Sequence, residues 1–202
     1  MSPILESIGS VKGFGWGAFA ALLPSFESIA TATGTGSNST LTLSSIPQTY
    51  KHLQIRYISR DTSAITNPAG IWIDLNNDTA ANYTQHYLIG NGSSASAAGN
   101  SAASTGGSPQ LSRATACGGM SANIFAAGII DIHDYSSTTK NKTIRAISGV
   151  DANAEVAGYR PTPRLASGQW RSTNAITSIT FSTAFGTAIT EKSHFALYGI
   201  KG

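Results

Sequence analysis

The chain has 202 residues, of which 41% are apolar and only 11% carry a charge, and its formal net charge is +3. This length suits a single all-β domain with an arm, and the charged fraction lies far below the ~25% that is usual in globular domains. The basic residues are dispersed, and we interpret the densest group, Lys140, Lys142 and Arg145, as a solvated loop and strand edge. Nucleic-acid binding usually needs a concentrated basic stripe, so we expect no nucleic-acid partner. The single cysteine, Cys117, excludes an intrachain disulfide framework and a cysteine-cluster zinc site.

Residues 1–24 are predicted to form an extended N-terminal arm. Within it, residues 13–24 combine alternating glycines with large apolar side chains, and the glycines disfavour a stable solitary helix. Large apolar side chains are costly to leave in water. We therefore expect the arm to anchor the protein on another subunit; the alternative is that it folds back onto its own domain. The side chains expected to bind the partner are Phe14, Trp16, Phe19, Leu22 and Leu23.

The arm raises two targeting alternatives, and the sequence disfavours both. Its apolar stretch is shorter than the ~20 residues that a membrane-spanning helix needs. Ala30-Thr31-Ala32 resembles the cleavage site of a secretory leader, but the only basic residue upstream is Lys12, and Glu6 is acidic. We therefore expect no membrane partner.

From residue 25 to residue 202 the sequence predicts one domain of short strands separated by polar turns. In the segment that begins at His52, for example, apolar Leu53, Ile55 and Tyr57 alternate with polar residues. We expect the first two strands to form a hairpin through the turn Gly-Thr-Gly-Ser-Asn. Because no helical stripe appears, about ten such strands indicate an all-β, two-sheet antiparallel β-sandwich, with a jelly roll as the expected topology. The predicted strands are 26–33, 40–44, 52–60, 70–75, 83–89, 123–132, 142–150, 169–171, 176–182 and 194–200.

Residues 91–110 form the one low-complexity segment of the domain. They contain no charged residue, no aromatic residue and no Leu, Ile or Val. Such a segment cannot bury enough apolar surface to order itself. We predict a long, flexible, exposed loop, which either binds a partner or serves only as a connection.

Two short groups of residues have types and spacings that could carry chemistry. Asp74, Asn76 and Asp78 have the spacing of the first half of a calcium loop, but the expected glycine and the twelfth-position glutamate are missing, so an ordinary turn is favoured. Asp131-Ile-His133 places a carboxylate and an imidazole on one strand face, which favours a structural hydrogen bond because no second histidine lies nearby in sequence. We therefore predict no catalytic, cofactor-binding or metal-binding residues and no cofactor.

The last strand has apolar residues on both faces. Phe195, Leu197 and Gly199 alternate with Ala196, Tyr198 and Ile200. Chain termini fray unless a sheet holds them. We therefore expect this strand to lie inside a sheet, with the core on one side and either a neighbouring chain or the arm on the other.

Three segments together resemble a family of β-sandwich structural proteins found in the virions of tailed phages, including cyanophages. They are Phe26-Glu-Ser-Ile-Ala-Thr, the segment 44–56 with its proline turn and following strand, and the C-terminal segment 191–202. The resemblance implies a non-enzymatic viral protein, assembled in the host cytoplasm and located in the virion. The leading expectation is a capsid decoration (cement) protein that binds and stabilises the head shell.

The resemblance also implies partners and alternatives. The partners are other virion proteins, namely the major capsid protein or tail proteins, and the chain is expected to be a homo-oligomer, with a trimer common among such proteins. The alternative is a tail-associated adhesin or fibre-tip domain that binds host-surface glycan through exposed tryptophan or tyrosine side chains, such as Trp72 or Trp170. A glycan-active enzyme is disfavoured, because the ten acidic residues show no obvious pairing of the kind that glycoside hydrolysis needs.

Overall fold

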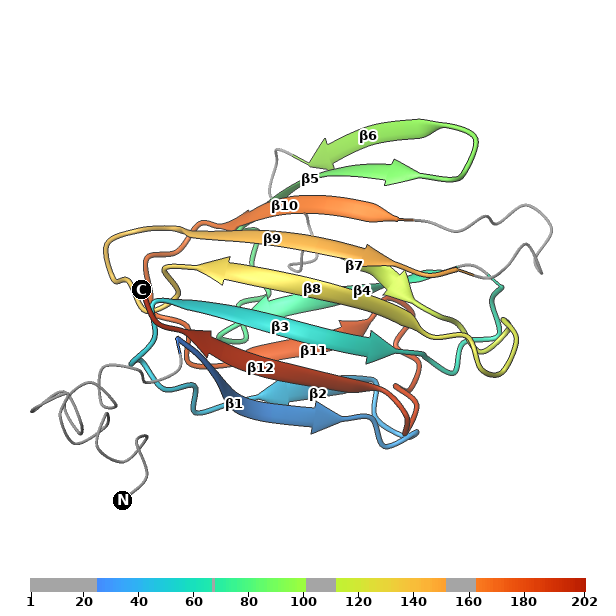
Figure 1. The fold of residues 1–202 in the computed structure, drawn as a ribbon, viewed down its shortest axis with the longest axis horizontal. Helices are drawn as coiled ribbons and strands as arrows, with labels where there is room; N and C mark the ends of the chain where they lie inside the picture. Colours follow the sequence, from blue (N-terminus) through green and yellow to red (C-terminus); the bar gives the residue numbers. More distant parts are fainter. Residues whose placement is uncertain (1–24, 67, 101–111, 152–162) are drawn as a thin grey trace, which may run out of the picture.

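A computed structural model describes residues 25–66, 68–100, 112–151 and 163–202 of the chain. These residues form twelve strands and no helix, arranged as two sheets packed face to face (Figure 1). Every pairing between the strands is antiparallel. The predicted all-β, two-sheet antiparallel sandwich is therefore confirmed. No helix in the described ranges is long and apolar enough to cross a membrane.

The two sheets differ in width. The large sheet has eight strands, in the order β1 (Phe26–Thr33), β12 (His194–Ile200), β3 (His52–Ser59), β8 (Ala126–His133), β9 (Lys142–Gly149), β10 (Arg164–Trp170), β5 (Tyr83–Gly90) and β6 (Ala95–Asn100). The small sheet has four, in the order β2 (Thr40–Leu43), β11 (Ile179–Thr183), β4 (Ala69–Leu75) and β7 (Ser112–Thr115). The last strand, β12, lies between β1 and β3, as its sequence predicted.

One hydrophobic core fills the space between the sheets. Its centre is a run of stacked aromatic rings: Phe195 of the large sheet lies 4.5 Å from Phe181 of the small sheet and 5.2 Å from Tyr57 of β3, measured between ring centroids. Gly128, which pairs with Tyr57, makes room for this stack, because a Cβ at that position would lie 2.6 Å from the tyrosine ring. The predicted alternation places residues correctly, since Leu53, Ile55, Ile71, Ile73 and Leu75 are all fully buried.

The predicted hairpin between the first two strands is wrong. β1 belongs to the large sheet and β2 to the small one, so the glycine-rich segment between them crosses from one sheet to the other. Gly34 permits this crossing, because a Cβ there would lie 2.0 Å from the carbonyl oxygen of Thr190. Gly34 therefore serves a close backbone approach, whereas Gly36 supplies a positive φ of 74°.

The predicted flexible loop at 91–110 is wrong over its first part. Residues 95–100 form strand β6, which pairs with β5 through the Asn91-Gly92 turn. The side-chain oxygen of Asn91 accepts hydrogen bonds from the backbone N–H groups of Ser93 and Ser94, and Gly92 has a φ of 80°. Asn-Gly is the strongest short-range hairpin signal, and backbone pairing needs no large apolar side chain. Residues 101–110 lie outside the described residues.

Two further expectations stay predictions. The jelly roll is not confirmed, since that topology has eight strands in two Greek keys whereas twelve strands are divided here into sheets of eight and four. The N-terminal arm, residues 1–24, lies outside the described residues, and so do the partner-binding side chains predicted in it.

The aromatic stack should dominate stability. Phe195→Ala removes a fully buried ring that joins the two sheets, and we expect it to lower the free energy of unfolding by ~3–5 kcal/mol. Phe185→Ala is the matched control, because Phe185 is 57% exposed in the turn after β11. Urea denaturation of both variants measures the difference; equal losses would contradict this account of the core.

Candidate interaction surface

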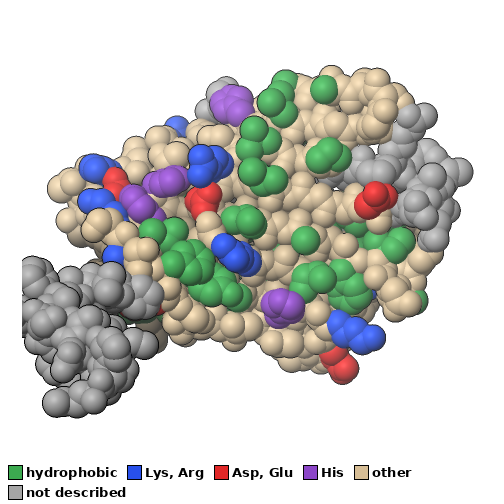
Figure 2. All heavy atoms as spheres, viewed as in Figure 1, with side chains coloured by type: hydrophobic (Ala, Val, Ile, Leu, Met, Phe, Trp, Pro, Cys, Tyr) green, Lys and Arg blue, Asp and Glu red, His purple; other side chains and the backbone are tan. Residues whose placement is uncertain are grey.

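The outer face of the large sheet carries a row of exposed apolar side chains. Ile129 pairs with Ile147, Ile147 with Leu165, and Leu165 with Leu88, so these four residues lie side by side across β8, β9, β10 and β5. Their exposed fractions are 41%, 62%, 45% and 54% in that order. Figure 2 shows this face, with apolar side chains spread over the strands on the β5–β6 side. We call these four residues the apolar row.

The apolar row borders two hollows in the outer face. The first has a volume of about 540 Å³ and is lined by Leu88, Ala97 and Leu165, with His86, Arg145 and Ser167 along one side. The second, about 340 Å³, shares Leu88 and Leu165 and continues past Ile147 to Pro163 and Ala95. Leu88 and Leu165 thus separate two adjoining depressions, which we call the groove.

A row of polar side chains runs beside the apolar row. Asp131 of β8 accepts a hydrogen bond from the amide of Gln54 at 2.9 Å through one oxygen and from the guanidinium of Arg145 at 3.0 Å through the other. Arg56 in turn donates to the side-chain oxygen of Gln54 at 2.9 Å. The expected Asp131–His133 hydrogen bond is replaced by these contacts to the neighbouring strands, and the ring of His133 packs against that of His52, 5.2 Å away.

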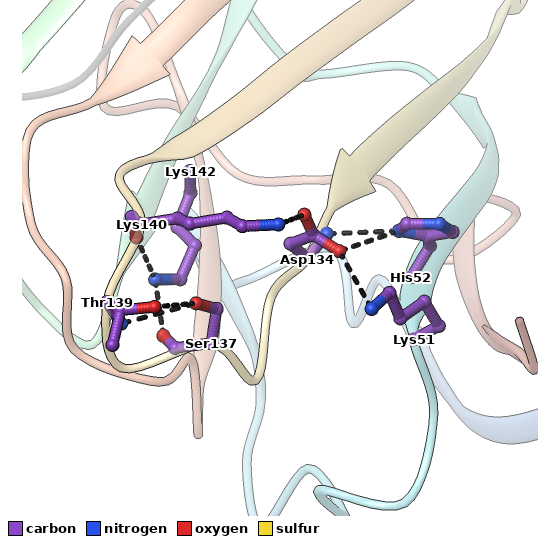
Figure 3. Close-up of polar contacts among 7 residues, drawn as sticks. All are labelled: Lys51, His52, Asp134, Ser137, Thr139, Lys140 and Lys142. Carbon is purple, nitrogen blue, oxygen red and sulfur yellow. Dashed lines mark hydrogen bonds and ion pairs between the residues drawn. The ribbon is translucent and has the colours of Figure 1, made fainter.

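A group of charged residues lies at one end of this face, around Asp134 (Figure 3). Lys140 donates to its carboxylate at 2.8 Å, and the Lys51 ammonium lies 3.6 Å away. The hydrogen bond from Lys140 holds the pKa of Asp134 below its usual value. Burial, and next the nearby His133, lower the pKa of His52, whose Nδ1 accepts the backbone N–H of Asp134 at 3.0 Å. The neutral imidazole is therefore the form that fits this contact.

Lys142, predicted to be solvated, is in fact fully buried. Its ammonium turns into the loop before β9 and donates to the carbonyl oxygens of Ser137 and Lys140 at 2.8 and 2.7 Å (Figure 3). It also donates to the carbonyl oxygen of Thr173, after β10, at 3.2 Å. Burial lowers its pKa. The sequence prediction failed because the loop folds back over the start of its own strand and presents carbonyl groups, which alternation in the strand does not reveal.

A second buried cation organises the loop that follows Cys117. The guanidinium of Arg60 donates to the carbonyl oxygens of Gly118, Met120, Ser121 and Ile124 at 2.6 to 3.1 Å. Cys117 itself is buried, and burial raises the pKa of its thiol to about 11. A thiol that is protonated at neutral pH is a poor nucleophile.

The turn that resembles half a calcium loop is used for structure. Asp78 accepts a hydrogen bond from the indole N–H of Trp170 at 2.7 Å and another from Asn82 at 2.9 Å. Asn76 accepts the backbone N–H groups of Thr177 and Ser178. Within the ranges that the structure describes, no group of three His, Cys, Asp or Glu residues could hold a metal ion.

The two tryptophans predicted to be exposed glycan contacts differ in their burial. Trp170 is buried in the core, stacked 6.4 Å from Tyr83, which contradicts its predicted exposure. Trp72 is half-buried on the outer side of the small sheet. The aromatic surface on the large sheet comes instead from Phe26 and Tyr198, whose rings stack 4.7 Å apart with the guanidinium of Arg56 5.2 and 5.7 Å from their centroids.

Sequence reasoning missed the apolar row, although a signal was present. Leu88-Ile89 and Ile129-Ile130 are adjacent apolar pairs inside otherwise alternating strands. Since successive side chains in a strand point to opposite faces, one member of each pair must point outward. The sequence could therefore have shown that the outer face is partly apolar, but not that residues from four strands meet in one row.

Comparisons with known proteins give little further direction. No family model matches the chain, and no curated protein matches it. Among solved structures, the chain is similar to the marine PL-14 alginate lyase from Aplysia kurodai, with 12% identity over 84% of this chain and 80% of that one and a TM-score of 0.37. A likeness this weak supports no statement about activity.

Removing the buried ammonium should destabilise the loop before β9. Lys142→Met leaves three carbonyl groups without their donor, and we expect a loss of about 2 kcal/mol or more. Lys140→Met is the matched control: Lys140 is 62% exposed, and a surface ion pair contributes only ~0–1 kcal/mol. Thermal and urea unfolding of the two variants tests this, and a larger loss for Lys140→Met would contradict it.

Proposed function

We propose that this chain is a non-enzymatic structural protein of a tailed-phage virion, and that it packs against neighbouring virion proteins through the outer face of its large sheet. The observation that carries the proposal is the apolar row Ile129–Ile147–Leu165–Leu88, exposed at the centre of a broad sheet. Contiguous apolar surface of this kind marks protein–protein contact sites. The family resemblance of the sequence supports the same class.

The energetics favour a contact that is repeated many times. Each side chain of the apolar row is roughly half exposed, so covering it contributes ~1 kcal/mol, and the four together ~4 kcal/mol. That is too little for one tight isolated complex once the cost of association is counted. In a symmetric particle, however, the same contact acts at every copy, and further contacts around it add to the total.

The leading form of the proposal is a head decoration protein that binds and stabilises the shell. The low charge content supports it, because a surface that is covered by neighbours must leave few charges without partners. On the outer face, charges gather around Asp134 and Arg145, whereas the second hollow of the groove is lined by apolar residues apart from Arg164, which is buried. A neighbouring protein of the particle would cover this half of the face.

A second candidate is a tail-associated adhesin that binds glycan. The specific observation in its favour is the stacked pair Phe26–Tyr198 with Arg56 against it, next to the hydrogen-bonding side chain of Gln54. Rigid aromatic surface beside planar polar groups is suited to sugar rings. This pair lies on β1 and β12, toward the opposite edge of the sheet from the groove, so the two candidates use different residues.

Copy number distinguishes the two candidates. In purified particles of the encoding phage, separated into heads and tails, quantitative mass spectrometry should find the protein with the heads, on the order of hundreds of copies by the repetition that shell symmetry imposes. Tens of copies or fewer in the tail fraction would favour the adhesin. Absence of the protein from both fractions would refute a virion role.

The face itself is tested by substitution. Ile147→Asp places a charge in the middle of the apolar row and should reduce the amount of protein on particles at least tenfold. Phe185→Asp is the control, since Phe185 is similarly exposed but follows β11 of the small sheet. Both proteins should fold, because both positions are exposed. Normal occupancy of Ile147→Asp would show that this face is not the contact.

A further inference from the structure

The groove around Leu88 and Leu165 needs an apolar, uncharged occupant. Its two hollows are lined mainly by Leu, Ile, Ala and Pro. Arg145 and His86 lie along one side of the first hollow, and Arg164, which lines the second, is buried with its guanidinium against the ring of Tyr87. Among the residues that the structure describes, no acidic residue lines either hollow. A charged or strongly polar segment would lose its hydration there without gaining partners.

This chain contains one segment of matching chemistry outside the described residues. Residues 13–23 carry no charge, and the large apolar side chains Phe14, Trp16 and Phe19 are followed by Leu22 and Leu23. The glycines at 13, 15 and 17 have no side chain, so the backbone there can lie close to a partner surface. The segment thus matches the apolar part of the groove's lining.

Distance decides whether the arm of the same chain can fill the groove. The arm joins the sheet at β1, where the Ser25 carbonyl accepts the Lys201 N–H at 2.9 Å. From β1 to β5 there are six strand spacings, or ~29 Å. Phe26 and Leu88 are also offset along the strands. Phe26 pairs with Ile200 of β12, whereas the row of paired residues that contains Leu88 passes through Ala196, four residues before Ile200. The diagonal from Phe26 to Leu88 is therefore ~32 Å.

Most of the arm of the same chain is too close to Phe26 in sequence to reach the groove. Phe19 lies seven residues before Phe26, and seven fully extended residues span at most ~24 Å. Leu22 and Leu23 are nearer still to the edge at β1, so only the part of the arm before Phe19 could approach the groove of its own chain. An arm that comes from a neighbouring copy has no such limit.

We propose that residues 13–23 of a second copy of this chain lie in the groove formed by Leu88, Leu165, Ile147 and Ala97. Each copy then gives an arm and receives one, which closes as a reciprocal dimer or as a ring such as a trimer. The inference deepens the proposed function by naming the occupant of the outer face, and it rests on that proposal only in treating the face as an interface.

The first test is made with full-length protein in solution. Sedimentation velocity of the unaltered chain should show a closed oligomer, Leu165→Asp should shift it at least tenfold toward monomer at equal concentration, and Phe185→Asp should leave it unchanged. Circular dichroism confirms that each variant is folded. An unaltered chain that is monomeric at high micromolar concentration overturns the inference, and so does an oligomer that Leu165→Asp leaves intact.

The second test traps the arm in place. One tagged full-length protein carries Ala18→Cys, which keeps every large apolar side chain of the arm, and a second, differently tagged one carries Ala97→Cys in the groove. Mixing and oxidation should give a disulfide-linked pair of the two tags, at least tenfold more than when Phe185→Cys replaces Ala97→Cys. Equal yields from both pairs overturn the inference.

A third protein distinguishes the arm of the same chain from that of a neighbour. A single chain with both Ala18→Cys and Ala97→Cys should oxidise to linked oligomers; a disulfide within monomers overturns the inference in favour of the chain's own arm. All these measurements use purified protein without particles. Protein that is monomeric in solution but present on virions, and lost from them with Ile147→Asp, would therefore refute the arm exchange and leave the proposed function standing.

Discussion

The contact between Phe195 and Phe181 is the one on which the rest of this structure depends. It joins the two sheets at the centre of the core, and it fixes which face of β12 points inward. Because the side-chain period of a strand is two, the inward direction of Phe195 makes Ala196 point outward. Paired residues on neighbouring strands point to the same face, so Arg56 and Ile129 also point outward, and so does Leu88 at the end of the row. A core contact thereby determines the composition of a surface five strands away.

Two cations, Lys142 and Arg60, hold loops together, as the aromatic stack holds the two sheets together. Each is buried, and each collects carbonyl oxygens from loop segments that have few ladder partners. Buried carbonyl groups need donors, and one ammonium or guanidinium supplies several from a single side chain. This is an economical way to order loops in a chain with so few charged residues.

Much of the sandwich could be predicted from alternation, and the failures have physical causes. Strand β3 was found because apolar and polar residues alternate from His52 to Tyr57, and β12 because apolar residues occupy both of its faces. Alternation does not encode the sheet to which a strand belongs, so the predicted pairing of β1 with β2 was wrong. Strand β6 was missed because its small side chains bury nothing, although its backbone pairs with β5. Trp170 was misplaced because its indole reaches Asp78, far away in sequence, from inside the core. The candidate surface was missed for the same reason, since its four members meet only through the register of the ladders.

The position of the apolar row also explains how a partly apolar face can avoid indiscriminate association. Aggregation through sheets usually begins at edge strands, where unpaired backbone groups act as a template. The apolar row crosses β8, β9, β10 and β5, whose backbone groups are already paired on both sides. A partner must therefore bind by fitting side chains into the groove and not by adding a strand to the row. Strand addition gains affinity from main-chain hydrogen bonds, whereas pockets for side chains give specificity, so this placement favours one specific neighbour.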